Sequence, residues 1–181
     1  MPRVQLLQDN VSDDRQLLLN EVHAAFGATP NMFRAVANSS AALRSMWGAF
    51  GALGQGKLEG KLGEQIAVAI ANINNCEYCL AAHTALGRKA GATGAEMEAA
   101  QIGESSDPRT AAALQFAVKL VRDRAQITDE DVSEMRAVGF DDEAIVEIIA
   151  HVALNLFTNY VNVALDVPVD FLGVRLRPIN K

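Results

Sequence analysis

Aromatic and basic residues are scarce in this sequence. Only 6% of the 181 residues are aromatic, although half are hydrophobic, so the apolar content is largely Ala, Leu, Val and Ile. That balance favours helices over a β-sandwich. The chain has 16 Lys and Arg against 22 Asp and Glu, and its net charge is -6. The basic residues are scattered and form no stripe that could neutralise phosphates, so we expect no nucleic-acid partner.

Long hydrophobic runs and a cysteine framework are also missing. No uninterrupted apolar run reaches the roughly 18 residues that a membrane helix needs, and the start, MPRVQLLQDNVSDDRQ, has no apolar core region. We therefore expect no membrane and a cytoplasmic location. The two cysteines, Cys76 and Cys79, are three positions apart, which does not match a secreted disulfide framework. In a reducing compartment such a pair more often does redox chemistry or binds metal.

Gly and Pro mark the breaks between periodic segments, and no Ser/Gly-rich linker divides the chain. We therefore predict one all-α domain over residues 1–181, a helical bundle with a polar N-terminal arm at 1–15. The pattern predicts helices over 11–27, 61–73 and 76–90, two short helices between 31 and 54, and helices starting after Asp107, Thr128 and Asp141. Only VPVDFLGV, residues 167–174, has a strand-like pattern. The apolar face expected for the first helix consists of Leu18, Val22, Ala25 and Phe26.

A faint internal similarity suggests that a helix-helix unit is used twice. Sliding Glu64 onto Glu147 also aligns Asn72 with Asn155. The second copy has asparagines, at positions 159 and 162, where the first has the two cysteines. Only the first copy could therefore do thiol chemistry.

The stretch NNCEYCLAAHTALGRKAG, residues 74–91, holds both cysteines and His83. With Asn74 as the expected N-cap, Cys76, Cys79 and His83 fall on one stripe of a helix, at steps of three and four. Backbone N–H groups and the helix dipole in the first turn stabilise a thiolate there. This pattern predicts a thiol pair with a nearby base.

Glu64 stands twelve residues before Cys76 in an otherwise apolar helical segment. Antiparallel pairing of this segment with the next helix would turn the carboxylate toward the core, where a charge without a partner is costly. We therefore expect Glu64 to face a polar group. A proton relay from Glu64 through His83 to the cysteines would satisfy it.

Other interpretations of these residues remain open. Both cysteines could be small buried hydrophobic residues. Cys76, Cys79, His83 and a carboxylate could also bind zinc, although structural zinc sites usually pair two ligand couples and the chain has no second couple. His151 fits a satisfied core or interface histidine, or a residue that lines the same cavity.

Glu64, the run NNCEYCLAAH and the later segment ALNLFTNYVNVALDVPVDF together resemble the alkylhydroperoxidase D family, within the carboxymuconolactone decarboxylase-like superfamily. The resemblance covers most of residues 29–171. It implies an all-helical subunit of a homo-oligomer that reduces organic hydroperoxides without haem or metal. A dithiol, lipoyl- or thioredoxin-like, would then restore the enzyme.

The resemblance also assigns roles to the four residues. Cys79 would be the peroxidatic thiol and Cys76 the resolving one, with Glu64 and His83 relaying protons. Physical arguments alone leave the attacking sulfur open, because the helix start favours Cys76 and the proximity of His83 favours Cys79. The chain departs from the best-known members at Tyr78, where they have a histidine.

Two other functions compete with the peroxidase. The superfamily also suggests a decarboxylating lyase for a muconolactone-like acid, although such enzymes do not rely on a cysteine pair. The third hypothesis is a non-catalytic, oligomeric redox-sensing module in which Cys76 and Cys79 merely report oxidation.

Overall fold

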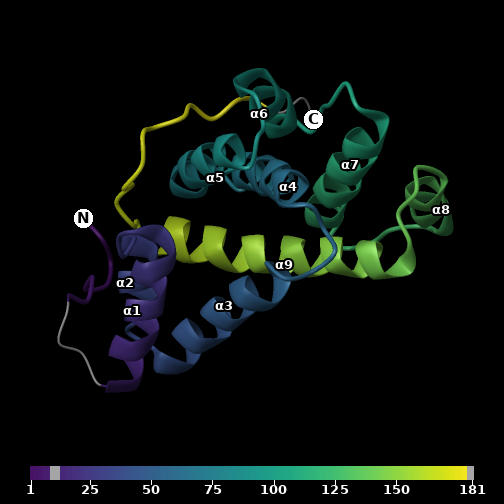
Figure 1. Cartoon of the computed structure of the whole chain (residues 1–181). Helices are drawn as coiled ribbons and strands as arrows, with labels where there is room; N and C mark the ends of the chain where they lie inside the picture. The colour runs from purple at the N-terminus through teal and green to yellow at the C-terminus, as the bar shows by residue number, and fades with distance from the viewer. Residues whose placement is uncertain (9–12, 179–181) are drawn as a thin grey trace.

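The computed structural model describes residues 1–8 and 13–178, and within them it confirms the all-α prediction. These residues form nine helices and no strand, and residues 167–174, which have a strand-like pattern, lie in an irregular segment. The helices, drawn in Figure 1, are α1 (Asp13–Phe26), α2 (Asn31–Val36), α3 (Ser40–Leu53), α4 (Gly60–Ile73), α5 (Glu77–Lys89), α6 (Gly94–Gln101), α7 (Pro108–Arg122), α8 (Asp129–Ala137) and α9 (Asp142–Ala164).

Helices α4 and α9 form the centre of the protein. Helix α4 packs against α5, α6, α7 and α9, while α9 also packs against α2, α3 and α5. In Figure 1, α9 crosses the middle of the molecule, with α1, α2 and α3 on one side of it and α4 to α7 on the other. Every residue of α4 from Gln65 to Asn72 is buried, as its all-round apolar pattern predicts.

The helix starts expected at three caps are confirmed. Asp107, Thr128 and Asp141 each accept a hydrogen bond from a backbone N–H in the first turn of α7, α8 and α9. The expected apolar face of α1 is partly wrong. Leu19 and Val22 are buried there, whereas Ala25 and Phe26 are exposed. Both lie at the C-terminal end of α1, where the Phe26 ring still packs against Phe33 and Trp47.

The predicted duplication of a helix-helix unit is not present. The second copy is the single, continuous 23-residue helix α9, whereas the first copy breaks between α4 and α5. That break needs a left-handed residue, Asn75, at φ 53°. The aligned residue in α9 is Thr158, whose branched side chain disfavours this conformation.

Helix α9 is long and apolar enough to cross a membrane when only length and composition are considered. Within the protein it has another role, because it contacts five other helices. Its amide side chains Asn155, Asn159 and Asn162 are all buried among those helices. We therefore describe α9 as the core helix of the bundle.

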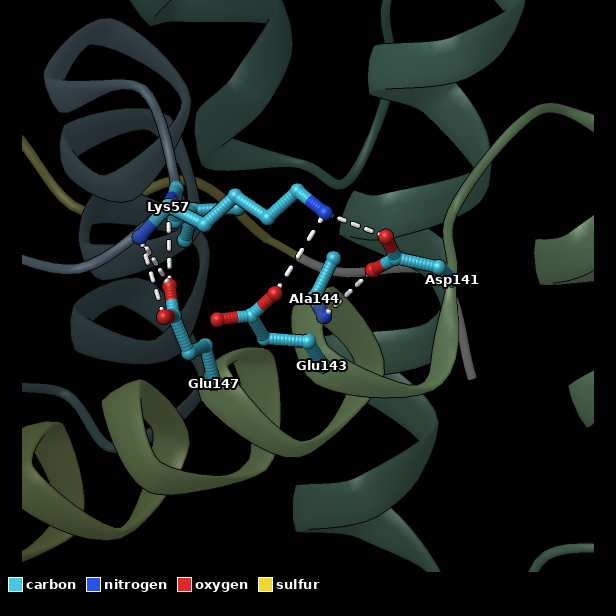
Figure 2. Close-up of polar contacts among 6 residues, drawn as sticks. Lys57, Asp141, Glu143, Ala144 and Glu147 are labelled. Atoms are coloured by element: carbon cyan, nitrogen blue, oxygen red, sulfur yellow. Dashed lines mark hydrogen bonds and ion pairs between the residues drawn. The ribbon is translucent and has the colours of Figure 1, made fainter.

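The loop between α3 and α4 is fastened to the start of α9 (Figure 2). The carboxylate of Glu147 accepts the backbone N–H groups of Lys57 and Leu58 at 2.8–2.9 Å. The Lys57 ammonium pairs with Asp141 and, at 3.5 Å, with Glu143. The loop that these contacts hold lines the cavity beside α4 that is described below.

Gly56 lies so close to this anchor that any side chain would displace it. A Cβ atom at Gly56 would lie 2.8–2.9 Å from the carboxylate of Glu147. We expect Gly56→Ala to push Glu147 off its two N–H donors and lower the free energy of unfolding by about 1–2 kcal/mol. Urea unfolding would measure it.

The control is Gly51→Ala on α3, where a Cβ meets no atom within 4 Å. Alanine at this helical position should raise stability by about 0.5–1 kcal/mol. Equal stability changes in the two variants would contradict the role of Glu147 as the anchor.

Candidate active site

The turn between α4 and α5 sets the position of both cysteines. Helix α4 ends in a Schellman motif, in which the N–H of Cys76 bonds to Ala71 O at 2.9 Å and that of Asn75 bonds to Asn72 O at 3.2 Å. Asn75 adopts the left-handed conformation, which Asn tolerates better than most residues. The next residue, Cys76, starts α5 without any intervening loop.

Cys76 is itself the N-cap of α5. Its Sγ accepts the backbone N–H of Cys79 at 3.2 Å. The prediction that Asn74 caps this helix is therefore wrong, because Asn74 ends α4 and its amide donates to Asn159 Oδ1 at 3.0 Å. A sulfur atom thus occupies the place where a helix N-terminus best stabilises negative charge.

The sulfur of Cys79 meets the amides of α9. Asn162 Nδ2 donates to Cys79 Sγ at 3.2 Å, and both cysteines are unbridged and almost fully buried. The Asn159 side chain also favours the Cys79 thiolate. Two buried polar atoms here, Asn159 Nδ2 and Asn162 Oδ1, have no partner among the described residues.

The environment drives the pKa values of the two thiols apart. The hydrogen bond from the Cys79 side chain lowers the pKa of Cys76, against the effect of burial, and the Cys79 N–H and the Asn162 amide lower it further. Burial raises the pKa of Cys79, and so do its hydrogen bond to Cys76 and the negative charge there. Of the two sulfurs, Cys76 is therefore the one that ionises more readily, with Cys79 as the thiol that donates to it.

Glu64 and His83 form the pair that their positions predict. His83 Nδ1 donates to the Glu64 carboxylate at 2.7 Å, across the interface of α4 and α5. The side chain of Glu64 is 24% exposed and that of His83 is 13% exposed. Each is therefore the polar partner that the other needs in a largely buried position. The bond to Nδ1 leaves Nε2 of His83 to exchange protons.

Cys79 and His83 line one cavity, which we call the apolar pocket. Its volume is about 60 Å³, and its walls are mostly aromatic and aliphatic side chains. The lining residues are Phe26, Pro30, Met32, Phe33, Phe50, Tyr78, Cys79, Ala82, His83, Leu86, Thr158 and Phe171. Cys76 does not line the apolar pocket. The structure therefore places Cys76 apart from Cys79 and His83, although the sequence predicts all three on one face of a helix.

A second cavity lies on the other side of His83, and we call it the histidine pocket. Glu64, His83 and His151 all line it, together with the loop from Gly54 to Gly60. His151 Nε2 is buried without a partner among the described residues, and burial lowers the pKa of this histidine. His151 is therefore not a satisfied core residue, and it borders the relay pair.

The residues that the structure describes contain no cluster of metal ligands. No group of three His, Cys, Asp or Glu side chains is arranged there to hold an ion. Cys79 shares the apolar pocket with His83, whereas Cys76 lines a different surface hollow.

Tyr78 holds the C-terminal segment over the apolar pocket. Its hydroxyl donates to Asp170 at 2.7 Å and accepts the backbone N–H of Met32 at 3.3 Å. Its ring meets that of Phe171 edge-on, with centroids 5.6 Å apart. Burial and the Asp170 carboxylate raise the pKa of Tyr78. The hydroxyl is thus a structural link between α2, α5 and the C-terminal segment.

The site includes residues for which the sequence suggested no role. Asn162 contacts Cys79, and Phe33 and Phe171 wall the pocket. The internal alignment, which sets Asn159 and Asn162 against the two cysteines, is the signal that could have revealed the amides. Phe171 ends the segment that carries the family resemblance, but no helical periodicity places it at the pocket, because it lies beyond α9.

Comparisons with known proteins agree with this fold. Residues 40–123 match the model of the carboxymuconolactone decarboxylase family. An uncharacterized peroxidase-related protein from Silicibacter sp. TM1040 is 28% identical, with a TM-score of 0.82 over 92% of this chain and 91% of that one. A second such protein, an alkylhydroperoxidase AhpD core from Ralstonia eutropha JMP134, is 25% identical, with a TM-score of 0.85 over 93% and 92%.

The fold also occurs in a protein of other chemistry. The debrominase Bmp8, solved as a C82A variant with 2,3,4-tribromopyrrole, is 20% identical, with a TM-score of 0.79 over 94% of both chains. A search of curated protein sequences found no match. Residues 40–123 thus match the carboxymuconolactone decarboxylase family model, and the chain has the fold of the alkylhydroperoxidase D-like, peroxidase-related proteins.

Proposed function

We propose that this protein is a thiol-dependent peroxidase that reduces organic hydroperoxides through Cys79 and Cys76. One observation carries the proposal: Cys79 and the Glu64-bonded His83 line the same apolar pocket. A nucleophilic sulfur, a proton carrier and an apolar wall are the parts that cleavage of an organic O–O bond needs.

The first step moves a proton between the sulfurs. Once Cys76 has ionised, the Cys79 thiol, which is hydrogen-bonded to it, passes its proton to Cys76. The Cys79 thiolate attacks the terminal peroxide oxygen, the O–O bond breaks, and His83 protonates the departing alkoxide. Cys79 becomes a sulfenic acid and the product is an alcohol.

The second step closes the cycle on the protein. Cys76 attacks the sulfur of the Cys79 sulfenic acid, the S–O bond breaks, and the Cys76 proton leaves with the hydroxide as water. The result is a Cys76–Cys79 disulfide, in which the two cysteines have supplied the two electrons. A dithiol then returns the pair to the reduced state.

We infer further features of the working enzyme from its surface. Large apolar side chains are exposed on α1 and α9, among them Leu17, Val146 and Tyr160. Such side chains favour a homo-oligomer. We also infer that the protein is a single domain and acts in the cytoplasm. A dithiol there would reduce its disulfide.

The amide of Asn162 would hold negative charge on either sulfur during this cycle. We expect Asn162→Leu to raise the pKa of both thiols, because the donor that favours each thiolate is lost. Alkylation by iodoacetamide at neutral pH should slow roughly fivefold. Thiolate absorbance followed against pH would show the upward direction of both shifts.

The matched control is Asn155→Leu, two turns earlier on the buried side of α9. The Asn155 amide donates to the His151 carbonyl and not to a sulfur, so the thiol titration should stay as in the wild type. An identical shift in both variants would contradict a specific role for Asn162.

A stoichiometric experiment tests the proposed function. The reduced protein is mixed rapidly with one equivalent of cumene hydroperoxide, and peroxide and free thiols are followed together. We expect fast loss of two thiols for each peroxide, with cumyl alcohol as product. If peroxide persists and both thiols stay reduced, the protein is not a thiol peroxidase.

A further inference from the structure

We propose that the two cysteines are served from opposite sides of Tyr78. On this proposal the hydroperoxide reaches Cys79 through the apolar pocket, while the reducing dithiol attacks Cys76 from a separate surface hollow. The dithiol is carried on a protein surface with a basic rim and an apolar tip. This inference rests on the proposed peroxidase cycle and adds to it the route and the charge of the reductant.

The first observation is that each sulfur borders a different cavity. Cys79 lines the apolar pocket. Cys76 lines a cavity distinct from both the apolar pocket and the histidine pocket, which we call the polar hollow. Its walls include Asn75, Glu77, Asp166 and Val169. Tyr78 is the residue of the motif that borders both, and it is 4% exposed. Its buried side chain therefore separates the two routes.

The second observation is the size of the two cavities. The polar hollow holds about 340 Å³, against about 60 Å³ for the apolar pocket. A narrow slot admits a small apolar molecule, whereas the wider hollow has room for a turn of another protein. The surface that is suited to a macromolecule is thus the one that borders Cys76.

The chemistry of the rim indicates the partner. Glu77 and Asp166 are exposed at the hollow. Val163 and Val169, 46% and 41% exposed, add an apolar surface between them. The N-terminal ammonium lies 3.4 Å from Asp166 in an exposed pair and partly neutralises that carboxylate. Glu77 is therefore the better residue for testing whether the charge of the hollow selects the partner. A partner with basic groups around an apolar tip complements this surface.

The exchange step follows from these positions. A thiolate of the reductant attacks Cys76 Sγ, the Cys76–Cys79 bond breaks, and Cys79 leaves as a thiolate beside the Asn162 amide. The second reductant thiolate attacks its own partner sulfur in the mixed disulfide and releases Cys76 as a thiolate. Two electrons pass from the dithiol, which ends as a disulfide.

The test uses the full chain, oxidised to the internal disulfide, and two synthetic peptides. Each peptide carries one cysteine and an adjacent leucine, flanked by lysines in one and by glutamates in the other. The mixed disulfide is located by mass spectrometry after acid quenching. We expect the peptide on Cys76 and not on Cys79. An adduct found mainly on Cys79 would overturn the proposal.

The rates test the charge of the rim. After each rate is normalised to the peptide's reaction with hydroxyethyl disulfide, the lysine peptide should react roughly three- to tenfold faster at low salt. The difference should shrink at high salt. Equal rates at low salt would reject the basic partner.

Charge reversal at Glu77 completes the design. Glu77→Lys should remove or invert the preference for the lysine peptide. The control is Glu130→Lys, which changes an exposed acidic residue in the first turn of α8 in the same way and should leave the preference intact. Inversion by both variants, or by neither, would contradict the role of the hollow.

The outcome for the route can be separated from that for the function. Diamide oxidises a thiol pair without any hydroperoxide, so it supplies the disulfide even if the protein does not reduce peroxides. If hydroperoxide fails to oxidise the pair, the proposed function is wrong. If the disulfide forms and the peptide attacks Cys79, only the route is wrong.

Discussion

Replacing Cys79 by serine is expected to reduce hydroperoxide turnover by roughly a thousandfold or more. A serine hydroxyl stays protonated in the apolar pocket and is a poor nucleophile toward the peroxide oxygen. The initial rate of cumene hydroperoxide loss, with dithiothreitol as reductant, measures the effect. This variant removes the only thiol among the described residues that line the pocket.

The companion variant is Cys76→Ser. It keeps the attacking sulfur, so it should consume one equivalent of hydroperoxide and stop at a sulfenic acid that a dimedone probe captures. The opposite pattern, a burst in Cys79→Ser and none in Cys76→Ser, would show that Cys76 attacks. Because the pKa of Cys76 is lowered, attack by Cys76 is the alternative that this pair of variants must distinguish from attack by Cys79.

Loss of either member of the Glu64–His83 pair should reduce turnover by roughly a hundredfold. His83→Gln removes the proton donor to the alkoxide, and Glu64→Gln removes the carboxylate that holds His83 Nδ1 at 2.7 Å. Because the two side chains act as one unit, the double variant should cost little more than either single variant. Steady-state rates with cumene hydroperoxide in the four proteins measure this.

His151→Gln provides the matched control for the relay. His151 borders the histidine pocket with Glu64 and His83, yet no hydrogen bond joins it to the pair among the described contacts. We expect its turnover to stay within roughly threefold of the wild type. A hundredfold loss in this variant would contradict a relay that consists of Glu64 and His83 alone.

The local rules of helix formation account for what the sequence predicted well. Asp107, Thr128 and Asp141 cap the helices that they were expected to start, since a side-chain oxygen next to free N–H groups is a local signal. The pairing of Glu64 with His83 was also predictable, because a carboxylate on an apolar helix must find a polar partner.

Features that depend on packing between distant segments were not predictable in this way. The partial exposure of Phe26, whose ring packs against Phe33 and Trp47, depends on how the ends of α1, α2 and α3 meet. The contact of Asn162 with Cys79 joins residues far apart in the chain. The N-cap role of Cys76 was missed because the Schellman motif, a tight turn, uses both Asn74 and Asn75 to end α4.

The continuity of α9 limits how far this protein is modular. The family match spans residues 40–123 and includes both cysteines, Glu64 and His83, but α9 begins only at Asp142. A fragment cut to that match would carry the reactive sulfurs without the amide of Asn162 and without the carboxylate of Glu147 that fastens the loop before α4. The recognisable motif and the functional unit are therefore different lengths of chain. Transplanting the site into another scaffold would require α9 as well.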